Sequence, residues 1–391
     1  MLWPAPARVR ATRRPGRAGT VAQWLVLPSA ARPRLLVPVG VRAGERMLTR
    51  HGDRLGPRVA RALLAAGVRS GLLERLPVQR LSVTAPPDSA SLQRHLAPYV
   101  GAGVAVGALL GTPRVNRKPV LQVFDPAGNT VAFVKAAHDD RTRWLVRREA
   151  DNLARVHALG LTTIEPPQVL HAGVFGALEL LVLSPLASSQ QEGRTGAAPP
   201  PLPAMAELAC SAGVVRTALA ESAYARRLQA WPAQGPTGQE ARVSRLVRTA
   251  LARYGAEEVD LGAWHGDWAP WNMGWSDDRL QLWDWERYAE GVPLGFDLVH
   301  YLSQRVRHDQ PELRAAEDAL VAALPAALPD VGVAAARARS TLVLYLLELA
   351  GRFVLPEGDG AGSDHPRARW ALDLAERLLT SADARSGDLG A

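Results

Sequence analysis

The sequence contains very little cysteine and lysine. Its 391 residues include one cysteine, Cys210, so no disulfide can form within the chain and a reducing, cytoplasmic location is expected. No apolar run approaches the ~20 residues that cross a bilayer, so no membrane association is expected. Of 46 basic residues only Lys118 and Lys135 are lysine. Because arginine does not replace a compact charge on a thin stem, these two positions call for a chemical role.

Positive charge is concentrated at the N-terminus. Residues 1–100 carry a formal balance of +13, which leaves −5 for the rest of the chain. A basic segment suggests nucleic-acid binding, but this one has no aromatic stacking platform and no zinc-ligand spacing, so that function is the least favoured. A basic stretch over 8–17 followed by a short apolar run over 21–27 has a crude signal-peptide outline, which Gln23 interrupts. A disordered basic leader over 1–20 is the alternative that we adopt.

The remaining chain divides into a β-rich part and a helical part. An N-terminal extension of unassigned role, 21–98, has two apolar runs that would pair as strands. We then expect five strands and, after the third, one helix over 141–159; the strands are 104–110, 120–124, 131–135, 169–170 and 178–183. The domain limits are 99–186 for the β-rich lobe, 187–203 for a Pro/Gly/Ser-rich linker or insertion, 204–382 for the helical lobe, and 383–391 for a disordered tail. This α+β order predicts two lobes with a cleft between them.

One stretch carries the chemistry. Asp267 is followed five positions later by Asn272, and Asp284 comes twelve positions further on, after an apolar run. Phosphoryl transfer needs a carboxylate that orients the acceptor hydroxyl and takes its proton, and oxygen ligands that hold magnesium against the nucleotide phosphates. A loop followed by a hairpin strand would bring such groups together. Protein kinases use the same five-residue offset between Asp and Asn.

The pattern His265-Gly266-Asp267, Asn272 and Asp284-Trp285-Glu286 resembles the aminoglycoside phosphotransferase and choline kinase-like branch of the protein-kinase-like fold. That branch has Gly where protein kinases have Arg, as at Gly266. The resemblance covers residues 100–380. It implies a small β-rich N-lobe, a five-stranded antiparallel sheet plus a helix, and a larger helical C-lobe. It also implies ATP and Mg²⁺ as cofactors and a small-molecule hydroxyl as acceptor.

The resemblance also implies residue roles. Asp267 would be the catalytic base, Asn272 and Asp284 the magnesium ligands, and His265 a packing residue of the loop. The stretch Gly295-Phe296-Asp297-Leu298 is similar to the family's helix start, where Asp297 would cap or brace the helix. Glu286 would either contact a second magnesium ion or make a salt bridge.

Lys135 ends the third expected strand, and Glu149 follows inside the expected helix. A strand lysine paired with a helix glutamate is the device with which kinases hold the α- and β-phosphates. The alternative is a surface ion pair worth ~0–1 kcal/mol. The scarcity of lysine favours the functional interpretation.

The nucleotide loop has no Gly-x-Gly-x-x-Gly pattern, which is a departure from protein kinases. We assign the loop to Gly111–Lys118, in which Lys118 either reaches a phosphate or is exposed. The hinge is expected at Leu183-Ser184-Pro185, where backbone groups of Ser184 would bind adenine; Pro185 has no N–H to offer.

Six of the 11 tryptophans lie between positions 264 and 285. They either pack under the catalytic loop or form an aromatic wall beside the acceptor, with Trp268 and Trp271 placed to do so. The acidic balance of the C-terminal part suits a cationic acceptor. The leading prediction is an ATP-dependent phosphotransferase acting on a small-molecule hydroxyl, and the alternative is a nucleotide-binding pseudokinase or scaffold.

Overall fold

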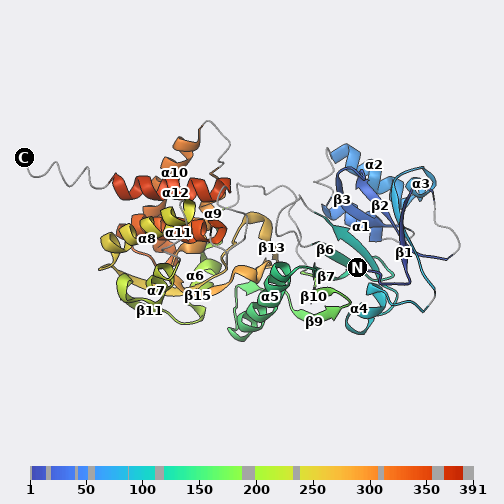
Figure 1. Ribbon diagram of the computed structural model, residues 1–391, viewed down its shortest axis with the longest axis horizontal. Helices are drawn as coiled ribbons and strands as arrows, with labels where there is room; N and C mark the ends of the chain where they lie inside the picture. The colour runs from blue at the N-terminus through green and yellow to red at the C-terminus, as the bar shows by residue number, and fades with distance from the viewer. Residues whose placement is uncertain are drawn as a thin grey trace, which may run out of the picture. The chain divides into compact units, whose positions relative to one another are not determined.

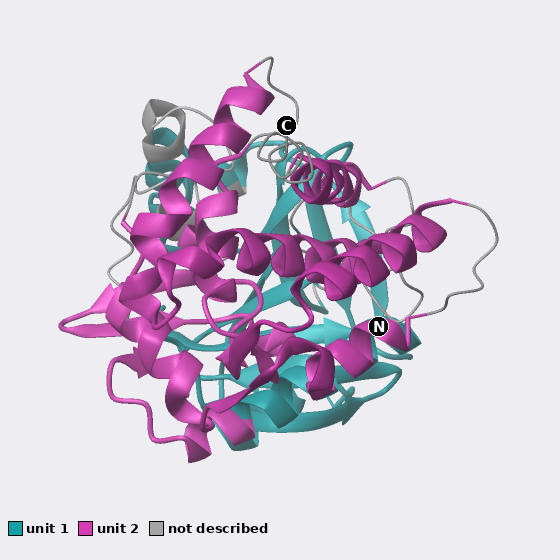
Figure 2. Ribbon diagram, turned by 90° about the vertical axis from the view of Figure 1, so that its left-hand side faces the viewer, with its two compact units in different colours: residues 1–153, 167–187 teal, residues 154–166, 188–391 magenta. Residues whose placement is uncertain are grey.

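The structure is a computed structural model that describes residues 2–14, 19–39, 43–51, 58–86, 88–110, 119–186, 199–231, 238–306, 312–354 and 365–381. The chain forms two compact units, coloured separately in Figure 2. The first comprises residues 1–153 and 167–187, and the second comprises 154–166 and 188–391. The expected tail, 383–391, lies outside the described residues.

The first unit is built on one nine-stranded sheet in which every neighbouring pair is antiparallel (Figure 1). The strand order is β1-β4-β2-β3-β5-β6-β7-β10-β9. The strands are β1 (Arg8–Thr12), β2 (Thr20–Pro28), β3 (Pro33–Pro38), β4 (Arg80–Thr84), β5 (Ala105–Leu109), β6 (Val120–Phe124), β7 (Thr130–Ala137), β9 (Val169–Phe175) and β10 (Leu178–Leu183).

The five expected strands are present as β5, β6, β7, β9 and β10, but they are part of a larger sheet. The expected leader supplies β1 and the N-terminal extension supplies β2, β3 and β4, and the pairing of Leu35 with Leu109 joins the two sets. The two apolar runs of the extension pair as expected, because β2 and β3 are antiparallel neighbours. The expected leader over 1–20 is corrected: Arg8–Thr12 form β1, an edge strand whose neighbour is β4. A five-stranded sheet therefore underestimates the sheet of this protein.

Helices cover both faces of this sheet. They are α1 (Ala43–His51), α2 (Arg58–Arg69), α3 (Leu72–Arg75), α4 (Leu92–Val100) and α5 (Asp140–Ala158). Alternate residues of β5 enter different cores, since Val106 joins the cluster that includes α4, whereas Leu109 packs on the cluster that includes α1. This two-residue period is the alternation that the pleat imposes on side chains.

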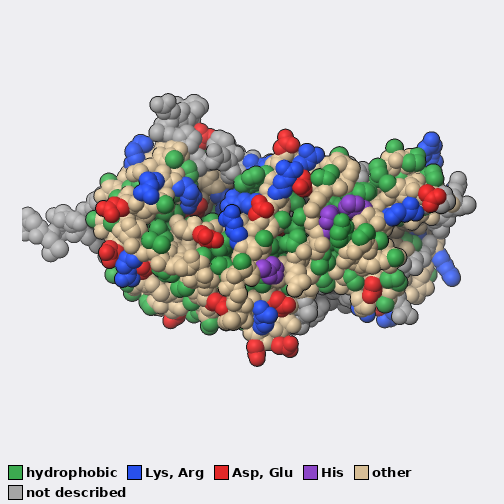
Figure 3. All heavy atoms as spheres, turned by 90° about the horizontal axis from the view of Figure 1, so that it is seen from below, with side chains coloured by type: hydrophobic (Ala, Val, Ile, Leu, Met, Phe, Trp, Pro, Cys, Tyr) green, Lys and Arg blue, Asp and Glu red, His purple; other side chains and the backbone are tan. Residues whose placement is uncertain are grey.

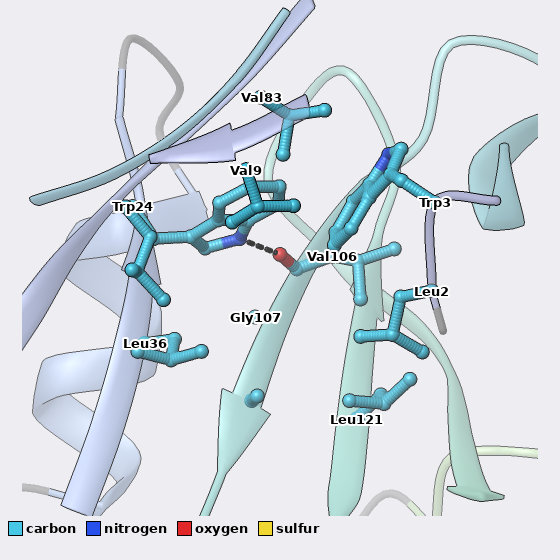
Figure 4. A pocket seen from close by; sticks show the side chains of 11 residues that line it. Leu2, Trp3, Val9, Trp24, Leu36, Val83, Val106, Gly107 and Leu121 are labelled. Carbon is cyan, nitrogen blue, oxygen red and sulfur yellow. Dashed lines mark hydrogen bonds between the residues drawn. The ribbon is translucent and has the colours of Figure 1, made fainter. Parts of the chain in front are cut away.

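A small apolar pocket lies beside β5 in the first unit (Figure 4). The indole N–H of Trp24 donates to the carbonyl of Val106 at 2.5 Å. Trp3 packs on Trp24 with ring centroids 4.6 Å apart, and Leu2 joins the pocket lining. The beginning of the chain is therefore anchored by apolar contacts as well as by β1.

The second unit is mainly helical and has two three-stranded sheets, β11-β12-β15 and β13-β14-β8. Its strands are β8 (Ile164–Glu165), β11 (Val215–Ala218), β12 (Glu258–Trp264), β13 (Met273–Ser276), β14 (Arg279–Leu282) and β15 (Ala289–Pro293). Its α-helices are α6 (Leu202–Ser211), α7 (Ala223–Gln229), α8 (Gln239–Tyr254), α9 (Phe296–Ser303), α10 (Leu313–Ala327), α11 (Ala338–Val354) and α12 (Pro366–Thr380). Short 3₁₀ turns are η2 (Leu219–Glu221), η3 (Pro270–Asn272), η4 (Trp285–Arg287), η5 (Leu328–Val331) and η6 (Ala335–Arg337). Both strands and helices are abundant, so the expected α+β class is confirmed.

None of the helices in the described part of the chain combines the length and the apolar character that a bilayer crossing requires. On the face seen in Figure 3, basic and acidic side chains of the described residues are interspersed without a broad area of one sign.

Candidate active site

A hairpin brings the three motif residues of the second unit close together in space. β13 and β14 pair antiparallel with Met273 opposite Leu282. The pairing continues by one step, because the N–H of Trp283 donates to the carbonyl of Asn272 at 3.0 Å. Asn272 therefore lies opposite Trp283, the residue before Asp284. This places Asn272 and Asp284 together at the open end of the hairpin. This is the strand–loop–strand arrangement that the spacing predicted.

The carboxylate of Asp267 is held through both oxygens. The amide nitrogen of Asn272 donates to Oδ2 of Asp267 at 2.9 Å and to its carbonyl at 2.9 Å. Nε2 of His300, on α9, lies 3.3 Å from Oδ1. The Asp267 side chain is 40% exposed, whereas that of His300 is 2% exposed. The base candidate thus has an open side and a firmly packed side.

A residue of α9 holds the loop that carries Asp267 by hydrogen bonds to its backbone. Asp297 is buried and accepts hydrogen bonds from the backbone N–H groups of His265 at 2.7 Å and Gly266 at 3.1 Å. The sequence suggested that Asp297 would cap or brace its helix, but the helix cap position is Gly295 and Asp297 braces the catalytic loop instead. Arg352, on α11, completes the brace by donating to the carbonyl of Gly266 at 2.7 Å.

His265 is fully buried, as a packing residue of the loop should be. Its Nδ1 accepts from the N–H of Asp267 at 3.2 Å, and its Nε2 faces the carbonyl of Trp283 at 3.1 Å. Since a carbonyl only accepts, Nε2 carries the proton. His265 therefore ties the loop of Asp267 to the strand end that precedes Asp284.

Three ionisable groups around the loop have shifted pKa values. Burial raises the pKa of Asp267, but the hydrogen bond from His300 and nearby positive charge outweigh it and hold that pKa well below its usual range. Burial lowers the pKa of His300 to about 4, against the opposing effect of Asp267. Burial raises the pKa of Asp297 to about 7, against its two backbone hydrogen bonds. At neutral pH, Asp267 is ionised and His300 is neutral.

The shifted pKa of His300 predicts a pH dependence of stability. Its pKa is about 4 in the folded chain, against the ordinary histidine value of 6.5 in the unfolded chain, so the folded state binds fewer protons than the unfolded state between these values. Compared with a His300→Gln variant, the wild type should lose about 3 kcal/mol of unfolding free energy as the pH falls from 6.5 to 4. Asp297 titrates in both proteins, so its opposite trend cancels in the difference. Denaturant unfolding across this range measures the effect.

A difference between wild type and His300→Gln that is flat between pH 4 and 6.5 would contradict a depressed histidine pKa.

Gly266 is required by the backbone of the loop. Its φ is +83°, and a Cβ there would lie 2.6 Å from the carbonyl oxygen of Arg287. Gly266→Ala should therefore cost about 3 kcal/mol of unfolding free energy, from a left-handed backbone and a steric clash together. Gly291 is the matched control, because its φ is +69° and nothing lies within 4 Å of its Cβ position. Gly291→Ala should cost only about 1 kcal/mol; equal losses in the two variants would rule out the clash with Arg287.

Asp284 occupies a backbone conformation that is rare for a residue with a side chain. Its φ is +68° and ψ is +53°, in the left-handed region. Non-glycine residues in this region cost energy and gather at functional sites. The neighbouring Glu286 lies 3.9 Å from Nε of Arg287, within the same short turn η4.

In the first unit, Lys135 and Glu149 form the buried pair that the sequence predicted. Nζ of Lys135, on β7, lies 2.6 Å from both carboxylate oxygens of Glu149, on α5. Their side chains are only 8% and 0% exposed. The surface ion pair that we considered as the alternative is therefore excluded.

Two further sets of predicted residues have different outcomes. The N–H of Ser184 donates to the carbonyl of Gln168 at 2.9 Å, and its hydroxyl accepts from the N–H of Gln168 at 2.9 Å. Gly111 and Lys118 lie outside the described residues.

The tryptophans near the site separate into packed and exposed members. Trp268 and Trp285 are completely buried, and Trp285 packs edge-on against His265 with ring centroids 4.8 Å apart. Trp271 is 62% exposed, four positions after Asp267. Packing under the loop therefore accounts for Trp268, while Trp271 retains the alternative of an aromatic wall.

Two residues that hold Asp267 and its loop were not predicted from the sequence. They are His300 on α9 and Arg352 on α11. A signal for His300 existed, because positions 297, 300 and 304 share one face of a helix by their spacing. No local pattern connects Arg352 with Gly266, which are 86 positions apart.

No protein-family model matches the chain, and no curated protein matches it. Solved structures of small-molecule kinases are similar to it. One is a thermostable mutant of an aminoglycoside phosphotransferase, with a TM-score of 0.48 and 14% sequence identity over 74% of this chain and 99% of that one. A second, assigned as a fructosamine-3-kinase of Haemophilus somnus 129PT, has a TM-score of 0.43 and 14% identity over 74% and 96%.

A third similar structure is an amicoumacin kinase in complex with AMP-PNP, Ca²⁺ and a ligand abbreviated Ami, with a TM-score of 0.35 and 12% identity over 70% and 88% of the two chains. These likenesses are of the kind that the sequence motif led us to expect. Because the TM-scores and identities are low, they assign neither an activity nor a substrate to this chain.

Proposed function

We propose that this protein is an ATP-dependent phosphotransferase that transfers the γ-phosphoryl group to a hydroxyl of a small molecule. One observation carries the proposal: the carboxylate of Asp267, ionised and open on one side, is held next to the hairpin end that bears Asn272 and Asp284. Such a group of oxygen-bearing side chains suits phosphoryl transfer, in which the protein mainly positions reactants and balances charge.

The donor atoms of the loop fit magnesium. The amide nitrogen of Asn272 is used by Asp267, so its amide oxygen would face a metal together with the carboxylate of Asp284. Among the described residues no three His, Cys, Asp or Glu side chains converge as a complete metal cage. Mg²⁺ commonly takes one or two protein oxygens and completes its shell with phosphates and water. When bound, Mg²⁺ would neutralise phosphate charge; Glu286 is a candidate contact for a second ion.

In the proposed reaction, Asp267 acts as the general base. As the acceptor oxygen bonds to the γ-phosphorus, the bond between that phosphorus and the β–γ bridging oxygen breaks and ADP leaves. The proton of the acceptor hydroxyl moves to the carboxylate of Asp267. Lys135 would bind the α- and β-phosphates and Glu149 would orient Lys135. The carbonyl of Ser184 would accept from adenine, and Gly111–Lys118 would supply the phosphate loop.

The test is a screen for acceptor-dependent ATP consumption in the presence of Mg²⁺. The acceptors are amino sugars, macrolides, choline, homoserine and simple sugars, and thermal shift reports binding of each. Stoichiometric ADP and a phosphorylated acceptor support the proposal. Nucleotide binding with no turnover on any acceptor would instead indicate the pseudokinase alternative, and absence of nucleotide binding would reject both.

A further inference from the structure

A chain of buried polar groups lies behind Asp267 and leads away from it into three helices. His300, on α9, is the first member, and its Nδ1 lies 3.0 Å from the hydroxyl of Tyr345 on α11. That hydroxyl lies 3.0 Å from Oγ of Ser303. Arg367, on α12, donates to Ser303 at 3.4 Å and to Oε1 of Gln304 at 2.9 Å. His300, Ser303 and Tyr345 are all buried, so each hydrogen must find an acceptor within the protein.

The neighbours of the two ring nitrogens decide where the proton of His300 resides. The hydroxyl of Ser303 lies 2.7 Å from the carbonyl of His300, which only accepts, so the Ser303 hydrogen is used there. The single hydrogen of the Tyr345 hydroxyl goes either to Nδ1 of His300 or to Oγ of Ser303, each at 3.0 Å. The ionised carboxylate of Asp267, whose Oδ1 faces Nε2, favours the first arrangement, in which Nδ1 accepts and Nε2 carries the ring proton. The opposite tautomer would place a lone pair against an ionised carboxylate.

Gln304 is a second neighbour of the same ring nitrogen. Its amide nitrogen lies 2.7 Å from Nε2 of His300, and its orientation is set by Arg367, which donates to its oxygen. An amide nitrogen only donates, so this contact by itself favours an Nε2 that accepts. The amide is neutral, whereas the Asp267 carboxylate is charged, and hydrogen bonds to an ionised acceptor are about twice as strong as those between neutral groups. We therefore take the contact with Asp267 as the one that sets the tautomer.

We propose that His300 is a positioning residue for Asp267, and that Tyr345 fixes the tautomer in which His300 donates to the carboxylate. The role rests on the proposed phosphotransferase function. One donor on each oxygen, His300 on Oδ1 and Asn272 on Oδ2, prevents rotation of the carboxylate. The exposed side of the carboxylate then points its remaining electron pairs toward the place where an acceptor hydroxyl would bind. A donor at this place also favours the ionised form, which is the form that accepts a proton.

Two substitutions at position 300 separate donation from packing. His300→Leu keeps an apolar side chain but has no donor, and kcat should fall about a hundredfold, with KM for ATP unchanged. His300→Gln keeps an N–H donor and should recover a large part of that loss. Tyr345→Phe should lower kcat about tenfold, because the tautomer is no longer fixed. Tyr224→Phe is the matched control, since Tyr224 is equally buried and its hydroxyl is 3.4 Å from a backbone carbonyl of the same helix α11; its kcat should not change.

A measurement that needs no turnover completes the test. In the full-length chain with ring-nitrogen-labelled histidine, NMR should show His300 at pH 7 as a neutral Nε2–H tautomer, and Tyr345→Phe should mix the tautomers. An Nδ1–H tautomer in the wild type overturns the inference, as does a folded His300→Leu enzyme with unchanged kcat. A wild type without any transfer activity overturns the proposed function instead, and NMR then still decides whether His300 donates to Asp267.

Discussion

Replacing Asp267 with asparagine is expected to lower kcat for phosphoryl transfer by about 10³-fold, because an amide takes no proton from the attacking hydroxyl. The substitution keeps the size of the side chain. It costs one of the two hydrogen bonds seen at the carboxylate, since the new amide nitrogen would meet the N–H donors of either Asn272 or His300. The loss of one charge-assisted hydrogen bond should reduce the unfolding free energy by about 1–3 kcal/mol. Steady-state kinetics with ATP and the acceptor found in the screen measures the first effect, and denaturant unfolding the second.

The control is an aspartate of the hairpin that follows the loop of Asp267. Asp278 lies exposed in the turn between β13 and β14, and Asp278→Asn should keep full activity. Equal activity of the wild type and Asp267→Asn would remove Asp267 from the reaction. If both variants lost activity alike, the effect would come from the charge of the hairpin rather than from a base.

Replacing Lys135 with alanine should have the largest effect on stability, a loss of about 3–5 kcal/mol of unfolding free energy. The reason is that Glu149, fully buried, would keep its charge without the ammonium that now lies 2.6 Å from both of its oxygens. The same variant should also bind nucleotide much more weakly, because phosphate charge loses its partner. Chemical denaturation and titration with a nucleotide analogue measure the two quantities separately.

A double variant distinguishes the structural role of Lys135 from its functional role. Lys135→Met with Glu149→Leu replaces the ion pair by apolar side chains of similar length, and such replacements of buried pairs are often neutral or stabilising. Its stability should return to the wild-type level while nucleotide binding stays lost. Recovery of binding together with stability would mean that Lys135 serves only the fold. The exposed pair of Arg94 and Asp88, 4.0 Å apart, provides the control, since Arg94→Ala should change stability by less than about 1 kcal/mol.

The residues of the loop and hairpin were readable from the sequence because their geometry is local. A hairpin fixes which residues face each other, so the offset between Asn272 and Asp284 already placed both at one end. The same holds for Lys135 and Glu149, which follow each other on adjacent elements and differ by 14 positions. In both cases the groups belong to elements that are consecutive along the chain, and a short connection keeps such elements close.

The size of the sheet was not readable, because it depends on pairing between distant segments. The extension resembled an independent segment, and nothing local shows that Leu35 pairs with Leu109 or that Arg8 pairs with Thr84. The strand β11, Val215–Ala218, depends on the same kind of pairing, because its partners on β12 lie 40 to 46 positions further along the chain. Register between remote strands follows from the buried face as a whole.

The sequence by itself therefore determined the two local groups on which the proposed chemistry rests, Asp267, Asn272 and Asp284 in one loop and hairpin and Lys135 with Glu149, since spacing along the chain sets the placement within each group. Tertiary structure alone decided what surrounds Asp267. His300, Arg352 and Tyr345 come from helices far along the chain, and they reach the loop only when α9 and α11 pack beneath it. Packing between distant segments depends on many weak contacts, so no single local sequence pattern predicts it.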